Sequence, residues 1–333
     1  MSRVPLRAGS SRMPHPRNRR SCVRLGYFED DFVRYFVKKP TRRSPLINRG
    51  YYSRYAALRQ LMLRFLMAAH GKGRRQILSL GAGYDTTFFS LAKQGVEPEL
   101  FIEVDCLDVT QRKTAKILET PVLRDALGLR GETETLAGDG SSVSTASVER
   151  GSIQSPHYRL CAADLRDLEA LKRALEEAQF DPGQPTFVLS ECVLVYLPPA
   201  DSQRVLDYLG GVCRCAAIVL YEQINPDDAF GQQMMLNLEL RGCPLLGLAQ
   251  CKDLAAQKER LAACGWSRTE ARSLDDIYSS LLDPQDRRRI EMLEIFDEFE
   301  EWHLIQQHYC VACGVIDQEN MLKDITLWPP NQL

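Results

Sequence analysis

The chain has 333 residues, of which 44% are hydrophobic and 26% charged, and its formal net charge is −2. These values lie near globular averages, so most of the chain should bury a core. The near balance of charge argues against a nucleic-acid-binding protein, which would carry a basic surplus. No apolar run approaches the roughly 20 residues that a membrane-spanning helix needs. We therefore expect a soluble monomer that binds neither nucleic acid nor membrane.

The eleven cysteines are scattered from Cys22 to Cys313 without evenly spaced pairs. This pattern favours free thiols in a reducing compartment. Cys310 and Cys313, with His308 nearby, have the spacing of half a zinc site, but no second pair follows. The segment from His308 to Val315 is instead typical of an apolar strand. We predict no bound metal and a cytoplasmic protein, with the nucleus as an alternative.

The first 28 residues contain seven arginines and no acid. A mitochondrial transit peptide can have this composition, so mitochondrial import stays an alternative location. Pro5, Pro14 and Pro16 would, however, break the amphipathic helix that such a peptide needs. We expect residues 1–20 to be a flexible basic arm and residues 21–333 to be a single domain.

Apolar periodicity predicts two N-terminal helices, at 29–37 and 48–69. After Gly73, short apolar segments alternate with amphipathic ones. Strands are expected at 76–80, 100–105, 158–162, 186–189, 217–221 and 308–315, and intervening helices at 86–93, 107–118, 165–178 and 200–213. This alternation predicts crossover connections and a doubly wound, mainly parallel α/β sheet.

Two regions depart from the alternation. Residues 138–155 are rich in Gly, Ser and Thr and predict a mobile surface insertion, because the alternation resumes after them. Residues 226–304 have a helical pattern. Helices are expected there at 230–240, 251–264, 274–282 and 286–304, and we expect them to cap the strand ends or pack beside the sheet.

The sharpest local motif is the segment Leu80–Thr87, Leu-Gly-Ala-Gly-Tyr-Asp-Thr-Thr. It predicts a strand that turns into a helix capped by Asp85 or Thr86. Glycine suits a sharp turn against which a ligand can lie. Thr86 occupies the position of the third glycine of a dinucleotide fingerprint, which disfavours a pyrophosphate site and therefore a nicotinamide dehydrogenase.

Acidic residues follow the next three strands. Asp105 ends the second strand, where a carboxylate can accept both ribose hydroxyls. Asp164 follows the third strand and could accept from an adenine amino group, and Glu191 follows the fourth. Any one of them could be only a helix N-cap. Together they should lie at the carboxyl edge of the sheet, and they suit S-adenosylmethionine better than a dinucleotide.

In this order the motifs resemble those of leucine carboxyl methyltransferases. The resemblance spans about residues 26–315, and its segments are Pro45–Tyr51, Leu80–Thr87, Phe101–Asp105, Ala163–Leu168, Glu191–Leu197 and Tyr221–Asn225. It implies a class I methyltransferase fold with a central seven-stranded sheet, one strand antiparallel, and extra helices that form a substrate cap. It also implies S-adenosyl-L-methionine as the cofactor. The implied substrate is the C-terminal leucine of the catalytic subunit of protein phosphatase 2A, bound through its tail and its active-site face.

The resemblance assigns the cofactor contacts residue by residue. Arg54 is similar to the arginine that binds the methionine carboxylate, Gly81 to the glycine beneath it, and Glu191 to the acid near the methionine amino group. Asp105 is similar to the ribose ligand. In the family a basic residue further upstream also reaches the cofactor.

Arg19 is similar to the upstream basic residue of the family that reaches the cofactor, and Arg17 and Arg20 are the alternatives for that role. Asp164 and Leu165 are similar to the adenine contacts of the family.

Two residues are expected near the reacting groups. Tyr196 resembles a tyrosine that lines the methyl-transfer pocket, and Arg49 is a candidate to steer the substrate carboxylate. A C-terminal carboxyl has a reference pKa of about 3.3–3.7, so it is ionised at neutral pH and needs no strong base. The site must instead strip its water and align it with the methyl group. For both Arg49 and Arg54 a plain helix-surface role is the alternative.

Other functions remain open from the sequence. A small-molecule O-methyltransferase would share Gly81, Asp105 and Asp164 and differ in the pocket helices. A protein that binds phosphatase tails without turnover is a second alternative, against which the intact acids argue. A related branch methylates a carboxyl on a modified transfer-RNA base and carries a long C-terminal repeat domain. The end of this chain at Leu333 and its net charge disfavour that branch.

Overall fold

The computed structural model describes residues 15–37, 39, 41–129, 147–149, 151–323, 325 and 328. Nine strands form one sheet with the order β3-β4-β5-β2-β1-β6-β7-β9-β8. Their bounds are β1 Gln76–Leu80, β2 Leu100–Asp105, β3 Ser147–Glu149, β4 Ser152–Gln154, β5 Tyr158–Ala162, β6 Thr186–Glu191, β7 Cys215–Gln223, β8 Arg268–Ser273 and β9 Tyr309–Asp317.

The seven strands from β5 to β8 form the core of the sheet. β5, β2, β1, β6 and β7 are mutually parallel, and β9 runs antiparallel to both β7 and β8. This arrangement confirms the expected doubly wound α/β sheet with one antiparallel strand. The chain runs outward from β1 to β2 and β5, then returns to β6 on the other side of β1. The order therefore reverses between β1 and β6, which is where open α/β sheets bind ligands.

Two further strands extend the sheet beyond the seven expected. β3 and β4 pair antiparallel, and β4 pairs with β5. They occupy 147–149 and 152–154, inside the expected insertion at 138–155, and Ile153 is fully buried. This burial explains why part of a Ser-rich segment joins the sheet. Residues 138–146 and 150 of the expected insertion lie outside the described residues.

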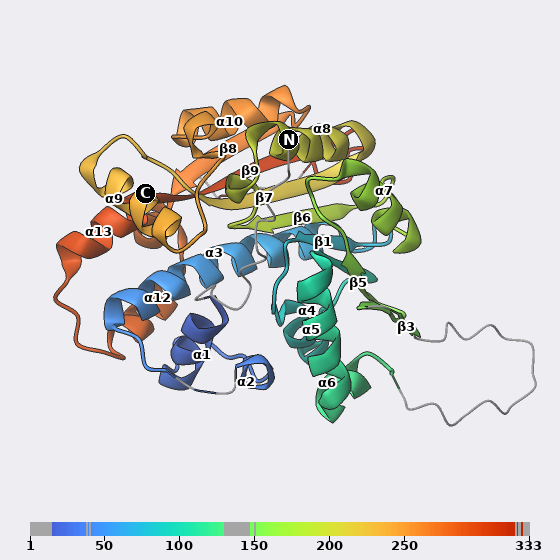
Figure 1. Ribbon diagram of the computed structural model, residues 1–333, viewed down its shortest axis with the longest axis horizontal. Coiled ribbons are helices and arrows are strands. Elements are labelled where there is room, and N and C mark those ends of the chain that lie inside the picture. The colour runs from blue at the N-terminus through green and yellow to red at the C-terminus, as the bar shows by residue number, and fades with distance from the viewer. Residues whose placement is uncertain are drawn as a thin grey trace, which may run out of the picture.

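Helices cover both faces of the sheet (Figure 1). The segments are α1 His15–Leu25, α2 Val33–Phe36, α3 Pro45–Ala68, α4 Thr87–Gln94, α5 Leu107–Glu119, α6 Pro121–Ala126, α7 Leu168–Glu177, α8 Pro199–Val212, α9 Ala229–Leu240, α10 Leu254–Ala263, α11 Leu274–Asp276, α12 Pro284–Glu291 and α13 Phe299–Gln307, with short turns η2 Leu194–Tyr196 and η3 Leu248–Gln250 and the π-helical turn η4 Ile277–Leu281. α7, α8 and α10 pack on one face, and α3 and α4 on the other. No helix among the described residues is long and apolar enough to cross a membrane.

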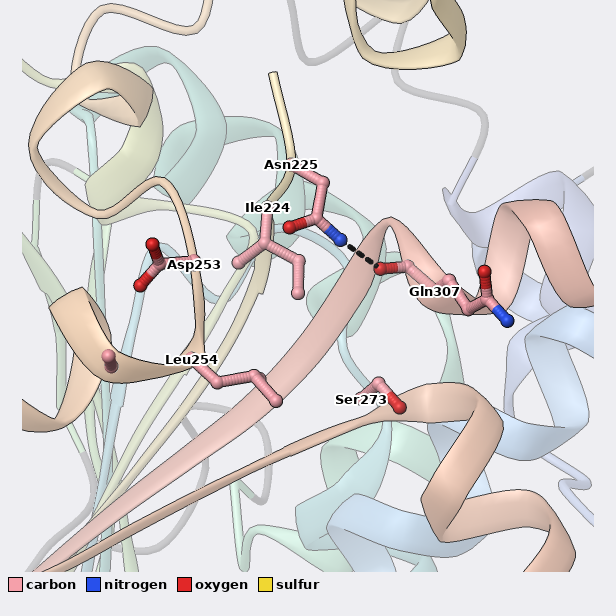
Figure 2. Close-up of a pocket in the computed structure, with 7 residues that line it drawn as sticks. Ile224, Asn225, Asp253, Leu254, Ser273 and Gln307 are labelled. Atoms are coloured by element: carbon pink, nitrogen blue, oxygen red, sulfur yellow. Dashed lines mark hydrogen bonds between the residues drawn. The ribbon is translucent and has the colours of Figure 1, made fainter. Parts of the chain in front are cut away.

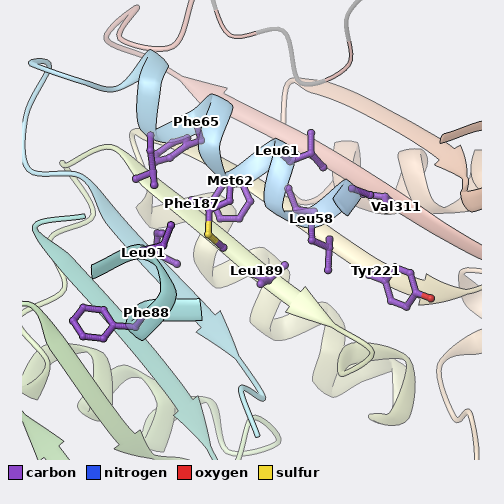
Figure 3. Packing of buried hydrophobic residues seen from close by; sticks show 14 of the residues in the cluster. Leu58, Leu61, Met62, Phe65, Phe88, Leu91, Phe187, Leu189, Tyr221 and Val311 are labelled. Atoms are coloured by element: carbon purple, nitrogen blue, oxygen red, sulfur yellow. The ribbon is translucent and has the colours of Figure 1, made fainter. Parts of the chain in front are cut away.

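The buried stripe of α3 lies across β6. The contacting side chains come from every third or fourth residue of α3, as an amphipathic helix requires. The packed side chains are Leu58, Leu61, Met62 and Phe65 of α3 and Phe187 and Leu189 of β6 (Figure 3).

The N-terminal segment differs from its prediction. Residues 15–20, expected in a flexible arm, belong to helix α1, and residues 1–14 lie outside the described part of the chain. Pro16 is in the first helical turn, where proline costs no intrahelical hydrogen bond. Cys22, fully buried, anchors the helix in the core. The helix expected at 29–37 is also shorter, because the Asp30 carboxylate accepts the N–H groups of Phe32 and Val33 and the helix begins only there.

The expected cap region, 226–304, contains α9 to α13. The single helix expected at 286–304 is two helices, α12 and α13. The strand β8 was not expected, because its sequence Arg-Thr-Glu-Ala-Arg-Ser is polar and no residue of it is fully buried.

Candidate functional site

The turn after β1 brings the backbone close to two neighbouring segments. Gly81 and Gly83 both have left-handed φ angles, +63° and +55°. A Cβ on Gly81 would lie 2.5 Å from Cγ2 of Val193, so this position needs glycine for steric as well as conformational reasons. A Cβ on Gly83 would meet nothing within 4 Å. The turn is therefore closed beneath Gly81 and open beside Gly83.

Asp105 lies next to that open space. Its Oδ2 accepts the N–H of Gly83 at 2.7 Å, and its Oδ1 accepts the N–H of Cys106 at 2.7 Å. Burial raises the pKa of the Asp105 carboxyl, and the two backbone N–H groups oppose that shift. Each oxygen keeps acceptor capacity for a further donor. The position fits a carboxylate that receives two hydroxyl groups.

Arg54 and Glu191 place opposite charges side by side. Arg54, on α3, donates from Nε to Oε1 of Glu191, at the end of β6. Its guanidinium lies 4.4 Å from the ring centroid of Tyr221 on β7. Both side chains are mostly buried, with 13% and 21% of their surfaces exposed. An adjacent cation and anion at a ligand-binding edge match the carboxylate and the ammonium of an amino-acid group.

Cys192, which follows Glu191, has a left-handed backbone with φ +57°. This conformation is uncommon for a residue with a side chain, and it concentrates at functional sites. The Cys192 N–H donates to the carbonyl of Tyr221 at 2.8 Å, which holds the end of β6 against β7.

Arg19 joins α1 to the glycine turn. Its Nε donates to Oδ2 of Asp30 at 2.6 Å and its Nη1 to Oδ1 of Asp85 at 2.8 Å. Thr86 also donates its hydroxyl to Oδ2 of Asp30, at 2.6 Å. Thr86 is the N-cap residue of α4, one of the two expected positions, but its side chain makes no capping hydrogen bond. The role of Asp30 was not foreseen, because its partners lie 11 and 56 residues away.

The three upstream arginines differ in burial. Arg19 is only 4% exposed, whereas Arg17 is exposed and Arg20 is half-buried. Arg19 also lines a narrow pocket of about 30 Å³. The other residues that line it are Tyr51, Tyr55, Leu58, Arg59, Met62, Thr87, Leu189 and Glu191. Arg19 and Glu191 therefore face one pocket, and Arg17 and Arg20 are not among the residues that line it.

Tyr196 ends the turn η2 close to β7. Its hydroxyl accepts from Nε2 of Gln223 at 3.5 Å, and Oε1 of Gln223 is buried without a hydrogen-bond partner. The Tyr196 hydroxyl is protonated at neutral pH, as tyrosine ordinarily is, and burial raises its pKa further, so it can donate a hydrogen bond.

Asp164 and Leu165 lie at the end of β5. Asp164 is 39% exposed at its side chain, and Arg166 binds both of its oxygens, with 2.9 and 3.0 Å from Nε. Leu165 is buried in the cluster beneath α7 and α8. These residues follow Asp105 along the same edge, because β5 pairs with β2.

Arg49 lies apart from this group. Its guanidinium is 3.8 Å from the ring centroid of Phe296 and 6.0 Å from that of Trp302. It is buried, and its Nε has no hydrogen-bond partner. Arg49 therefore lies against the segment between α12 and α13. Sequence could not foresee this placement, since Phe296 is distant in the chain.

A larger open hollow, of about 510 Å³, lies elsewhere on the carboxyl edge. It is lined by residues that flank β7, β8, β9 and α10: Ile224, Asn225, Asp253, Leu254, Ala255, Ser273 and Gln307 (Figure 2). Asn225 spans it by donating from Nδ2 to the carbonyl of Gln307 at 2.8 Å. None of the residues predicted for the cofactor lines this hollow, so size alone does not locate the site.

The cysteines make no cluster with metal-binding geometry. All eleven are free. Cys310 and Cys313 lie within β9, and residues three apart in a strand point to opposite faces. One ion could not take both. Within the ranges that the structure describes, no three His, Cys, Asp or Glu residues gather as a metal site would require.

Comparison with known proteins decides the family. The family model described as leucine carboxyl methyltransferase matches residues 15–210. The chain belongs to this family. The leucine carboxyl methyltransferase 1 homolog of Arabidopsis thaliana is 45% identical over 304 residues, which cover 91% of this chain and 87% of that protein. Leucine carboxyl methyltransferase 1 of Rattus norvegicus is 36% identical, over 92% of this chain and 90% of that protein.

A second kind of relative is longer. The tRNA wybutosine-synthesizing protein 4 of Rattus norvegicus is 39% identical over 95% of this chain, but the match spans only 44% of that protein. Family membership is therefore compatible with more than one substrate, and the substrate has to be argued from the site.

Proposed function

We propose that this chain transfers a methyl group from S-adenosyl-L-methionine to the C-terminal leucine carboxylate of the catalytic subunit of protein phosphatase 2A, giving a methyl ester. The observation that carries the proposal is the Arg54–Glu191 pair at the same sheet edge as Asp105. Support for the protein substrate comes from the 45% identity to the leucine carboxyl methyltransferase 1 homolog of Arabidopsis thaliana. The two relatives from Rattus norvegicus, 36% and 39% identical, do not separate the substrates. The net charge of −2 also favours the protein substrate.

The residues at the edge suit each part of the cofactor. Arg54 would hold its carboxylate and Glu191 its ammonium, and Asp105 would accept its ribose hydroxyls. The pocket of about 30 Å³ has no room for a nucleoside, so that part would extend past the open side of Gly83 toward Asp164 and Leu165. When bound, the cofactor supplies an electrophilic methyl group on a sulfonium.

The protein's task toward the substrate is alignment and desolvation. A terminal carboxylate is already the nucleophile, so no residue has to remove a proton. Tyr196, which is protonated at neutral pH, would donate a hydrogen bond to one carboxylate oxygen and leave the other free to react. Arg49, buried and stacked on Phe296, would support the segment between α12 and α13 instead of contacting the reacting atoms.

The test uses labelled S-adenosylmethionine with the purified phosphatase catalytic subunit. We expect label on the intact subunit, none when the final leucine is removed or its carboxyl is amidated, and release of the label by mild alkali, because esters hydrolyse where N-methyl groups persist. Replacing that leucine by alanine should weaken methylation, because the substrate loses the transfer free energy of the leucine side chain, on the order of 1.5–3 kcal/mol.

The outcomes of these assays, with transfer RNA as a further test substrate, separate the alternatives. An alkali-stable label, or full methylation of the truncated subunit, would refute carboxyl methylation of the tail. Label on transfer RNA instead would move the second class of relatives ahead. Binding of the phosphatase without any turnover would favour the non-catalytic alternative.

A further inference from the structure

Glu222 is a carboxylate buried in β7, directly before Gln223 at the end of the strand. Its side chain has no exposed surface. Side chains alternate along a strand, so Glu222 points to the face covered by α10, opposite to Tyr221 and Gln223. A buried carboxylate is costly unless it is paired and hydrogen-bonded, so its partners indicate what it holds.

One oxygen of Glu222 holds the turn that carries Tyr196. Oε1 accepts the backbone N–H of Val195 at 2.8 Å. Val195 is the middle residue of η2, and the first N–H groups of a short helix have no partner within it. Glu222 therefore supplies, from another element, the acceptor that this turn lacks, one residue before Tyr196.

The other oxygen is held by α10. Arg260 donates from Nη1 to Oε2 at 3.2 Å, and Gln257 donates from Nε2 at 3.4 Å. The Arg260 side chain is only 9% exposed. The α10 residues thus neutralise the charge of Glu222 through Oε2, while Oε1 accepts the hydrogen bond from Val195.

A second contact fixes the same peptide from its opposite side. The carbonyl of Val195 accepts the N–H of Gly247 at 2.8 Å, and the carbonyl of Gly247 accepts from the thiol of Cys251 at 3.2 Å. A Cβ on Gly247 would lie 3.2 Å from the Val195 carbonyl oxygen, so the two backbones are in close contact. Val195 is therefore held through both its N–H and its carbonyl.

We propose that Glu222 is the positioning residue for Tyr196: by holding the N–H of Val195 it fixes the turn from which the Tyr196 hydroxyl reaches the methyl-transfer pocket. The inference rests on the role proposed for Tyr196 above. Gln223 contacts that hydroxyl from the other face of the same strand end, so adjacent residues of β7 control the backbone and the side chain of one tyrosine. A displacement of about 1 Å at a reacting group can cost about a hundredfold in rate.

The experiment compares Glu222→Leu, Glu222→Gln and Arg260→Met in the full chain, with the exposed Glu176→Gln as the matched control. Leucine removes the acceptor for Val195, glutamine keeps one acceptor oxygen, and Arg260→Met removes only the charge partner. We expect Glu222→Leu to lower kcat by about tenfold to a hundredfold, with KM for the phosphatase and Kd for S-adenosylhomocysteine changed less than about threefold. Glu222→Gln should keep much of the kcat that Glu222→Leu loses. Arg260→Met should mainly lower the free energy of unfolding and have a smaller effect on kcat.

Hydrogen exchange of a peptide that contains Val195 gives a readout independent of turnover. We expect faster exchange there in Glu222→Leu, and unchanged exchange around Gly83. The decisive measurement is a double-mutant cycle with Tyr196→Phe. If Glu222 acts through Tyr196, substituting Glu222 should lower kcat little in a variant that already lacks the Tyr196 hydroxyl. Where Glu222→Leu is too unstable to purify, Glu222→Gln enters the same cycle.

An equal loss of kcat from the Glu222 substitution with and without the Tyr196 hydroxyl would overturn the proposal in favour of a purely structural role. So would a Tyr196→Phe variant with unchanged kcat, since no group would then need positioning. If the wild-type protein does not methylate the phosphatase, the proposed function fails. Exchange at Val195 then still decides whether Glu222 holds the turn.

Discussion

Asp105→Asn tests the cofactor site at its most constrained acid. In the structure each carboxylate oxygen already accepts one backbone N–H, from Gly83 and from Cys106, at 2.7 Å. An asparagine has one acceptor oxygen, so its amide nitrogen must face one of these two N–H groups. The substitution therefore removes a charge from the ribose site and also sets one donor against another beside the glycine turn.

The expected loss can be estimated from the hydrogen bonds involved. A hydrogen bond to a charged group is worth about 1.5–3 kcal/mol, and every 1.4 kcal/mol is tenfold in affinity. We expect Kd for S-adenosylmethionine to rise roughly tenfold to a hundredfold. Because burial raises the pKa of Asp105, wild-type affinity should fall as pH drops through that raised pKa. The variant should lack this dependence.

Titration calorimetry at several pH values, with thermal unfolding as a check on the fold, measures both effects. Asp108→Asn is the matched control: Asp108 lies three residues further on, is about half exposed, and pairs only with Arg112 among the contacts that the structure gives. A variant at Asp105 that binds the cofactor within twofold of wild type, with the same pH dependence, would remove Asp105 from the site.

Arg19→Met should lower the free energy of unfolding by about 3–5 kcal/mol, because it leaves two buried carboxylates without their cation. Deletion of residues 1–14 should leave urea unfolding and cofactor affinity unchanged. If the deletion and Arg19→Met lowered the free energy of unfolding equally, that result would be inconsistent with the ion pairs. Burial raises the pKa of Glu103 to about 7. The native state therefore retains a proton that the unfolded chain has released, and the free energy of unfolding should fall as pH rises from about 4.5 to 7. Glu103→Gln should flatten this slope in urea titrations, and an unchanged slope would assign it to other groups. Arg49→Lys should cost about 0.5–2 kcal/mol of stability through the lost stacking on Phe296. Its affinity for S-adenosylmethionine should not change, and a Kd raised more than threefold would contradict the placement of Arg49 away from the cofactor.

The central strands could be predicted because their burial is nearly complete. β1, β2 and β5 have the expected bounds, since each is an apolar run that ends at a glycine or near an acid. β8 could not be predicted, because its polar residues pack on only one face at the edge of the sheet. The bounds of α1 could not be predicted, because the arginines and prolines of this segment favour a flexible arm. The tertiary contacts of Cys22 and Arg19 are what make the segment a helix of the domain.

For the candidate site, the sequence predicts which acidic residues follow strands and therefore lie at one edge of the sheet. Asp105, Asp164 and Glu191 were found because parallel strands deliver their ends to one edge, and the sheet order brings those ends together. Residues that act through distant partners were not found. Glu222 meets Val195 and Arg260, 27 and 38 residues away, and no local pattern marks such a contact.

The ion pairs of Arg19 join the N-terminal helix α1 to the turn between β1 and α4. Asp30 accepts from Arg19, from the Thr86 hydroxyl and from two backbone N–H groups, so its lone pairs are fully used. A carboxylate with this many buried donors cannot lose one without leaving an unpaired group, which costs about 1–3 kcal/mol. α1, the segment before α2 and the start of α4 must therefore become ordered together. Any ligand that binds against the turn between β1 and α4 then also stabilises α1, because binding energy adds to the stability of every element that the bound state requires.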